Sequence, residues 1–142
     1  MNTLNISFPL ERSEIISMLQ GYKISPTRQR VEIAEFIFQR PQHLSAENIL
    51  DGVIDAGNRV SRATVYNTMG LFSSKGVVRE VLIDRERVFY DSNTEPHQHL
   101  YNVDTGVLTD VYDVENNMVT EPELPEGIRI INTDIVYKVT SR

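Results

Sequence analysis

Four stretches in the first half of the chain repeat apolar residues with the period of an α-helix. They predict helices over residues 11–20, 25–39, 45–56 and 61–75. Three serines stand where these helices begin and suit the N-cap position: Ser25, Ser45 and Ser61. Three glycines stand where helices end and suit the C-cap: Gly21, Gly57 and Gly76. The first half is therefore mainly helical, after a loose arm over residues 1–10.

At residue 77 the pattern changes to strict alternation, which is typical of β-strands. Residues 77–83 and 87–90 form the arms of a predicted hairpin around the turn Asp84-Arg85-Glu86. Within the first 90 residues, helices are followed by a hairpin, and this order of elements is typical of a winged helix-turn-helix domain. In that geometry the helix over 61–75 enters the major groove of DNA.

The second half has the pattern of a small sheet. It predicts a hairpin around Asp104-Thr105-Gly106, an acidic loop or very short helix over 114–127, and a final strand over 128–139. If Thr105-Gly106 is a two-residue loop, Tyr101 pairs with Asp110. A sheet of three short strands is only marginally stable, so we expect a partner chain to cover or extend it in a dimer.

The net charge of −6 is divided unevenly between the halves. Residues 1–90 carry 11 basic and 10 acidic side chains, whereas residues 91–142 carry 3 and 10. An acidic surface repels phosphate, so any DNA binding is expected from the first half. There are no cysteines, which excludes disulfides and thiolate zinc sites. The chain has neither an apolar run long enough for a membrane span nor a secretory signal, so we expect a cytoplasmic protein with no membrane contact.

Histidines and aspartates suggest a metal site where the charge changes. His97 and His99 are two residues apart, which places both side chains on one face of a strand. Asp91 precedes them, Asp110 follows them, and His43 stands just before the third helix. Imidazole and carboxylate donors without sulfur suit Fe²⁺, Mn²⁺ or Zn²⁺. We predict that these five residues bind one divalent metal; the alternative is that they are ordinary polar residues on a hairpin.

The helix over 61–75 begins with side chains that suit DNA recognition. Serine, threonine and arginine at a helix N-terminus can contact phosphates, whereas asparagine and tyrosine can read base edges. The predicted DNA-binding residues are Lys23, Arg28, Ser61, Arg62, Thr64, Tyr66, Asn67, Arg85 and Arg87. The alternative for a single residue such as Tyr66 is a place in the hydrophobic core, where Val65 and Met69 are expected.

Taken in order, four sequence blocks resemble the ferric uptake regulator family. They are Pro26-Thr27-Arg28-Gln29-Arg30, His43-Leu44-Ser45-Ala46-Glu47, Ala63-Thr64-Val65-Tyr66-Asn67-Thr68, and Asp91 followed by His97-Gln98-His99. The resemblance implies an α+β fold with a winged-helix DNA-binding domain over 1–90. It implies an α/β dimerisation and metal-sensing domain over 91–142. The implied protein is a metal-dependent transcription factor, expected to be a repressor and not an enzyme.

The resemblance also assigns roles to residues. It places the family's hinge metal site on the five histidines and aspartates named above, and its base-contacting tyrosine on Tyr66. Asn67 stands where many members have arginine, which implies a different operator sequence. The aspartate at position 91 makes this site similar to that of the peroxide-responsive members. In those members Fe²⁺ at the site can drive oxidation of the histidine ligands.

The family's structural zinc site is missing from the sequence. Its first cysteine pair would fall at Asn102 and Thr105. In this respect the chain resembles the iron response regulator subgroup, which is associated with haem. That subgroup's cysteine-containing haem motif is also missing, so haem would have to bind through a histidine such as His97 or His99.

These features suggest a switch in which metal at the hinge fixes the angle between two winged helices on a near-palindromic operator. One alternative hypothesis is a non-haem iron enzyme that uses two histidines and a carboxylate. Another is a winged-helix adaptor that needs no metal. The native metal, the signal (iron, manganese, haem or peroxide) and the operator sequence remain open at this stage.

Overall fold

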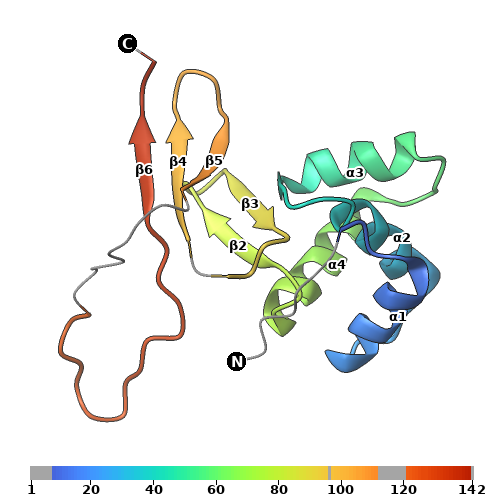
Figure 1. The fold of residues 1–142 in the computed structure, drawn as a ribbon, viewed down its shortest axis with the longest axis horizontal. Helices are drawn as coiled ribbons and strands as arrows, with labels where there is room; N and C mark the ends of the chain where they lie inside the picture. The colour runs from blue at the N-terminus through green and yellow to red at the C-terminus, as the bar shows by residue number, and fades with distance from the viewer. Residues whose placement is uncertain (1–7, 96, 112–120, 142) are drawn as a thin grey trace. The chain divides into compact units, whose positions relative to one another are not determined.

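The computed structural model describes residues 8–95, 97–111 and 121–141 (Figure 1). The chain divides into two compact units, Met1–Glu95 and Pro96–Arg142. Asp91, the first residue of the predicted second domain, belongs to the first unit. Most of the predicted N-terminal arm (residues 1–7) and much of the predicted acidic loop (residues 114–120) lie outside the described residues. The functional roles assigned to the two domains stay predictions.

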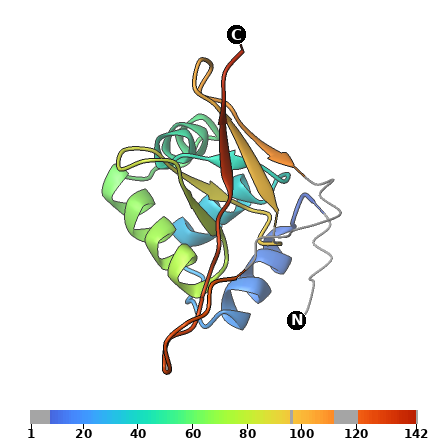
Figure 2. The ribbon, with the colours of Figure 1, turned by 90° about the vertical axis from the view of Figure 1, so that its left-hand side faces the viewer.

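All four predicted helices are present in the first unit: α1 (Arg12–Gly21), α2 (Arg28–Ile37), α3 (Ala46–Asp55) and α4 (Arg62–Lys75) (Figures 1 and 2). Ser45 and Ser61 are N-caps as predicted, and their side chains accept hydrogen bonds from the backbone N–H groups of Asn48 and Thr64. The prediction of Ser25 as the N-cap of α2 was wrong. Thr27 takes that place because its hydroxyl accepts the backbone N–H of Arg30, so α2 begins later than predicted.

One hydrophobic core joins the four helices of the first unit. Its fully buried side chains come from every helix and include Ile15, Leu19, Ile33, Ile37, Ile49, Val53, Val65, Met69 and Phe72. The predicted core positions Val65 and Met69 are thus confirmed. Tyr66 is 48% exposed, so its alternative assignment to the core was wrong. Helix α4 therefore buries one face and presents Tyr66 on the other.

The first unit also contains a three-stranded antiparallel sheet. Strands β2 (Arg79–Leu82) and β3 (Val88–Asp91) form the predicted hairpin. A third strand, β1 (His43–Leu44), pairs with β3 and gives the order β1-β3-β2. The sequence pattern missed β1 because two residues are too short to show an alternation. This strand places the segment before α3 against the end of the hairpin.

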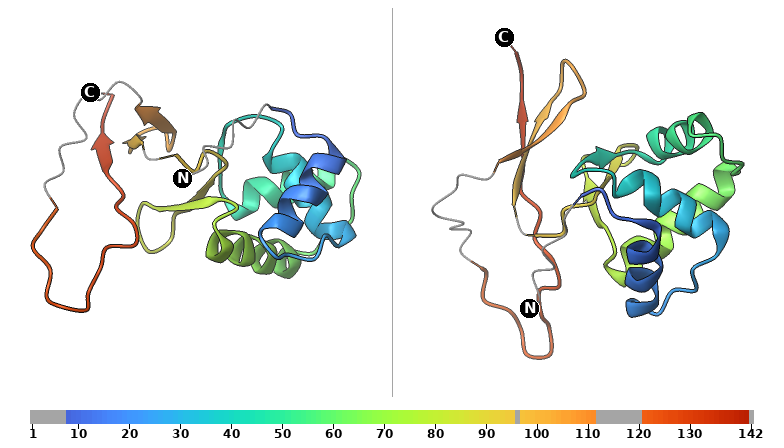
Figure 3. Two further views of the ribbon diagram at one scale, coloured as in Figure 1. Left: turned by 60° about the horizontal axis from the view of Figure 1, so that its bottom comes forward. Right: turned by 45° about the vertical axis from the view of Figure 1, so that its right-hand side comes forward.

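The second unit contains strands β4 (Gln98–Asn102), β5 (Leu108–Val111) and β6 (Val136–Val139). They form a sheet of order β5-β4-β6, in which β6 runs parallel to β4 (Figure 3). The predicted strand over 128–139 shortens to its last residues. Within 97–111 and 121–141 the regular elements are these strands, so the helix implied by an α/β domain is not among the residues described there.

The predicted pairing of Tyr101 with Asp110 was wrong. His99 lies opposite Asp110, and Tyr101 lies opposite Leu108. The turn is longer than two residues because the Asn102 side chain accepts the backbone N–H groups of Asp104 and Thr105. Gly106 closes the turn by donating its N–H to the Asn102 carbonyl, with a left-handed φ of 72° that favours glycine. The corrected register brings Asp110 directly across from a predicted metal ligand.

Two helical glycines should respond oppositely to alanine. At Gly70 in α4 an added Cβ meets nothing within 4 Å, so Gly70→Ala should raise the free energy of unfolding by about 1 kcal/mol. At Gly52 in α3 the Cβ would overlap the Phe36 ring, so Gly52→Ala should lower that energy by roughly 1–3 kcal/mol. Urea unfolding of both variants measures the two effects. Equal stability of the variants would contradict the packing of Phe36 against α3.

Candidate metal centre

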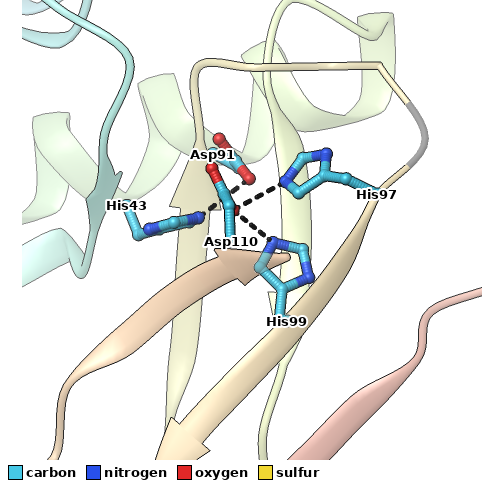
Figure 4. Close-up of side chains that lie close together, drawn as sticks. All are labelled: His43, Asp91, His97, His99 and Asp110. Carbon is cyan, nitrogen blue, oxygen red and sulfur yellow. Dashed lines mark ion pairs between the residues drawn. The ribbon is translucent and has the colours of Figure 1, made fainter. Parts of the chain in front are cut away.

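Two of the five predicted ligands meet within the first unit. His43 on β1 and Asp91 on β3 are direct partners in the antiparallel register. The Nε2 atom of His43 lies 3.1 Å from Oδ2 of Asp91 (Figure 4). Asp91 is fully buried, and its other oxygen accepts the backbone N–H of Asn93 at 2.9 Å. The short strand that the sequence pattern missed is therefore what brings this His43–Asp91 pair together.

Gln42 and Ser92 hold the His43–Asp91 pair in place. The backbone N–H of Gln42 donates to the Ser92 hydroxyl at 3.0 Å, and the Ser92 N–H donates to the Gln42 carbonyl at 3.2 Å. The Gln42 amide also donates to the carbonyls of Phe36 and Ile37, at 3.0 Å each. These bonds attach β1 to the last turn of α2. Sequence reasoning missed Gln42 and Ser92, and only their places next to the ligands could have indicated them.

The other three predicted ligands meet within the second unit. The Nε2 atoms of His97 and His99 lie 2.8 and 3.2 Å from Oδ1 of Asp110 (Figure 4). The two imidazole rings are 4.4 Å apart between centroids. His99 lies on β4 across from Asp110 on β5, and His97 immediately precedes β4. The two-residue spacing thus places both imidazoles beside one carboxylate, and this His97–His99–Asp110 cluster is almost entirely buried.

The donor atoms fit a divalent metal of intermediate hardness. Each of the five residues offers a nitrogen or oxygen atom that can coordinate a metal ion. Fe²⁺, Mn²⁺ and Zn²⁺ all accept mixed imidazole and carboxylate ligands. Buried carboxylates are costly unless positive charge compensates them, and a divalent cation is one source of that charge. The donor chemistry and burial therefore agree with the predicted metal, whereas a plain polar hairpin surface would leave these groups exposed.

The predicted DNA-binding residues of α4 lie at its exposed beginning. The hydroxyls of Ser61 and Thr64 are 2.9 Å apart. Arg62 forms an ion pair with Glu47 of α3, and the Tyr66 hydroxyl donates to the same Glu47 oxygen at 3.2 Å. Sequence reasoning did not identify Glu47 as part of this surface, because its partners lie 15 and 19 residues away along the chain.

Asn67 lines a polar hollow of about 230 Å³ between α2 and α4. The lining residues are Thr27, Gln29, Arg30, Thr64, Asn67, Thr68 and Leu71. Arg30 is fixed there by a hydrogen bond from its guanidinium to the Ser25 carbonyl at 3.0 Å. The structure thus brings Thr64 and Asn67 together with a basic residue that was not among the predicted contacts.

The remaining predicted DNA contacts lie on turns and on α2. Lys23 is exposed in the turn after α1, and the Arg28 guanidinium is 3.9 Å from Glu32. Arg85 is exposed in the β2–β3 turn, whereas Arg87 forms an ion pair with Asp84 at 2.7 Å. Hydrogen bonds from the Glu86 backbone and from Arg87 lower the pKa of Asp84. Arg87 is thus tied to a carboxylate that stays ionised.

Comparison with known proteins gives a consistent result. The model of the ferric uptake regulator family matches residues 11–138. A ferric uptake regulation protein of Pseudomonas aeruginosa is 33% identical over 129 residues, covering 89% of this chain and 96% of that protein. The peroxide-responsive repressor PerR of Staphylococcus epidermidis is 27% identical over 108 residues, covering 76% of this chain and 71% of that protein. The similarity therefore includes both units.

Solved structures confirm the predicted fold class. The ferric uptake regulator from Pseudomonas aeruginosa with manganese has a TM-score of 0.72 and 26% identity, over 90% of this chain and 98% of that one. The regulator from Vibrio cholerae has a TM-score of 0.68 and 21% identity, over 88% and 98% of the two chains, which supports the fold alone. Among the described helices none is long and apolar enough to span a bilayer. This chain is a member of the ferric uptake regulator family.

Proposed function

We propose that this chain is a metal-dependent transcriptional regulator that binds a double-stranded DNA operator as a homodimer. Its targets are genes of iron or other metal homeostasis or of the peroxide response, and its action is repression in the cytoplasm. The observation that carries the proposal is the set of buried and half-buried histidine and aspartate donors in a chain of this family. The proposed role is regulatory, without catalytic turnover.

In this proposal the His43–Asp91 pair and the His97–His99–Asp110 cluster bind one metal ion together. Five residues separate Asp91 from His97, and the six steps of chain can span at most about 22 Å. The two groups of ligands are therefore tethered at high effective concentration. When bound, the metal supplies positive charge that both carboxylates share. His43 and Asp91 would attach the DNA-binding unit to the ion, and the other three residues would attach the second unit to the same ion.

The proposed switch acts through the orientation of the DNA-binding units. A metal-free chain samples many orientations, so the DNA-competent one is diluted. Metal shifts this balance only as far as it binds the competent arrangement more tightly. We predict that within the family this chain groups with the peroxide-responsive or iron response regulators, with haem as an alternative cofactor.

Exposed apolar residues of the second unit support the proposed homodimer. Ile131 is 87% exposed, and Ile128 and Tyr137 are 59% and 49% exposed. Large apolar side chains exposed close together along a chain are typical of interaction surfaces. A second copy packed over this segment would bury them and stabilise a sheet of three short strands.

Metal removal tests the proposed function. After treatment with a chelator, the affinity of the protein for an operator selected from a random DNA library should fall by about 5–150-fold, because coupling between sites usually has that size. Mn²⁺, Fe²⁺, Zn²⁺ and haemin are then added separately, each before and after peroxide, and binding is followed by fluorescence anisotropy at fixed salt. Unchanged operator affinity across all of these conditions would refute metal-dependent regulation.

A further inference from the structure

Glu47 forms a bridge between two predicted DNA contacts on α4. Its Oε1 atom accepts the Tyr66 hydroxyl at 3.2 Å and pairs with Nη1 of Arg62. Arg62 and Tyr66 are one turn apart on α4, and Glu47 reaches them from the first turn of α3. One carboxylate thus fixes the orientation of two side chains on the surface proposed to face DNA.

Stability gives little reason for this arrangement. The side chains of Arg62 and Glu47 are 62% and 46% exposed, and exposed ion pairs contribute little to folding. An acidic side chain on a DNA-facing surface also repels phosphate. Arg62 is the first residue of α4, where no acidic side chain of α4 itself is present and a cation opposes the helix dipole. Glu47 supplies the missing negative charge at this position.

We propose that Glu47 is a specificity-determining residue for operator recognition. Its carboxylate holds the Arg62 guanidinium and the Tyr66 hydroxyl toward base edges and keeps Arg62 from binding the phosphates of unrelated DNA. Phosphate contacts carry no sequence information, whereas base contacts do. Withholding one cation from phosphates therefore lowers non-specific affinity more than operator affinity. This inference rests on the proposed function as a DNA-binding regulator.

The substitution Glu47→Gln keeps the size of the side chain and removes its charge. With Arg62 released to a phosphate, the slope of log affinity against log salt on a scrambled duplex should steepen by about 0.9. The ratio of operator to scrambled-duplex affinity should fall, and the fall should be about 3.5-fold larger at 50 mM than at 200 mM salt, since one additional phosphate contact on the scrambled duplex changes affinity by that factor between the two concentrations. The full-length protein loaded with Mn²⁺ is used throughout, and both duplexes are titrated by fluorescence anisotropy.

Two further variants separate this role from a general effect of charge. Asp51 is exposed one turn further along α3, so Asp51→Asn makes the same change in charge and should leave the salt slope unchanged. In an Arg62→Gln background, Glu47→Gln should have no further effect on the slope, because the released guanidinium is gone. Thermal unfolding of each variant shows whether it is folded.

The possible results distinguish the inference from the function on which it rests. Equal salt slopes for wild type and Glu47→Gln would overturn the role of Glu47, as would equal effects of Glu47→Gln and Asp51→Asn. Persistence of the Glu47→Gln effect without Arg62 would also overturn it. If the wild-type protein with Mn²⁺ enriches no duplex from a random library and binds none, the proposed function itself fails.

Discussion

Replacing His99 with alanine is expected to lower the affinity for Mn²⁺ by more than about 100-fold and to abolish metal-dependent operator binding. Loss of a residue that only supports a ligand typically costs 10–100-fold in metal affinity, and His99 is proposed to be a ligand itself. Its imidazole is 1% exposed and lies 3.2 Å from Asp110. Without it, the half-buried Asp110 carboxylate keeps the His97 imidazole as its neighbour within the second unit. Competition titration with a fluorescent chelator measures the metal affinity directly.

Thr109→Ala is the matched control for His99→Ala. Thr109 precedes Asp110 on β5, is exposed, and its side chain points to the other face of the strand. This variant should bind Mn²⁺ like the wild type. Wild type at 100 times its dissociation constant should gain about 2.7 kcal/mol of stability from metal, whereas His99→Ala should gain almost none at the same concentration. A normal metal-induced thermal shift in His99→Ala would show that His99 is not a ligand.

The elements that have a long periodic pattern could be predicted from the sequence. Helices α1 to α4 and the β2–β3 hairpin repeat their apolar positions often enough to be recognised, and the caps Ser45 and Ser61 mark two beginnings correctly. The start of α2 was missed because Ser25 and Thr27 both suit an N-cap, and only backbone geometry decides between them. Local pattern therefore settles the type of an element better than its boundary.

The candidate site depends on pairings that no local pattern contains. Strand β1 is too short to predict, yet it makes His43 the register partner of Asp91. The side chain of Asn102 stabilises a turn longer than the predicted one. The register partner of Asp110 is therefore His99 and not Tyr101. Residue types and spacing were enough to propose the ligands. The contacts between these ligands depend on strand pairing in the folded chain. They also depend on hydrogen bonds from side chains to the backbone, which can favour a longer turn over the shortest one.

Replacing His43 with alanine should separate metal binding from its effect on DNA binding. His43 and Asp91 are the proposed ligands of the first unit, so the His97–His99–Asp110 cluster is intact in this variant. We expect Mn²⁺ affinity to fall by about 100-fold or more, because His43 is a proposed ligand and even loss of a residue that only supports a ligand typically costs 10–100-fold. At saturating Mn²⁺ the operator affinity should still fall toward the metal-free level, because Asp91 is then the one proposed ligand that links the ion to the first unit. Anisotropy titrations at Mn²⁺ concentrations above the measured dissociation constant give this result directly.

Thermodynamic linkage makes the His43→Ala prediction stricter. If metal raises operator affinity by a given factor, the operator must raise metal affinity by the same factor. Wild type should show equal factors in both directions, and His43→Ala should show factors that are equal to each other but smaller than those of wild type. Pro41→Ala, at an exposed position two residues earlier, should keep the wild-type factors. Full metal-dependent operator binding by His43→Ala at saturating Mn²⁺ would contradict the hinge mechanism. In that case the His97–His99–Asp110 cluster would remain a metal site that acts on DNA binding without His43.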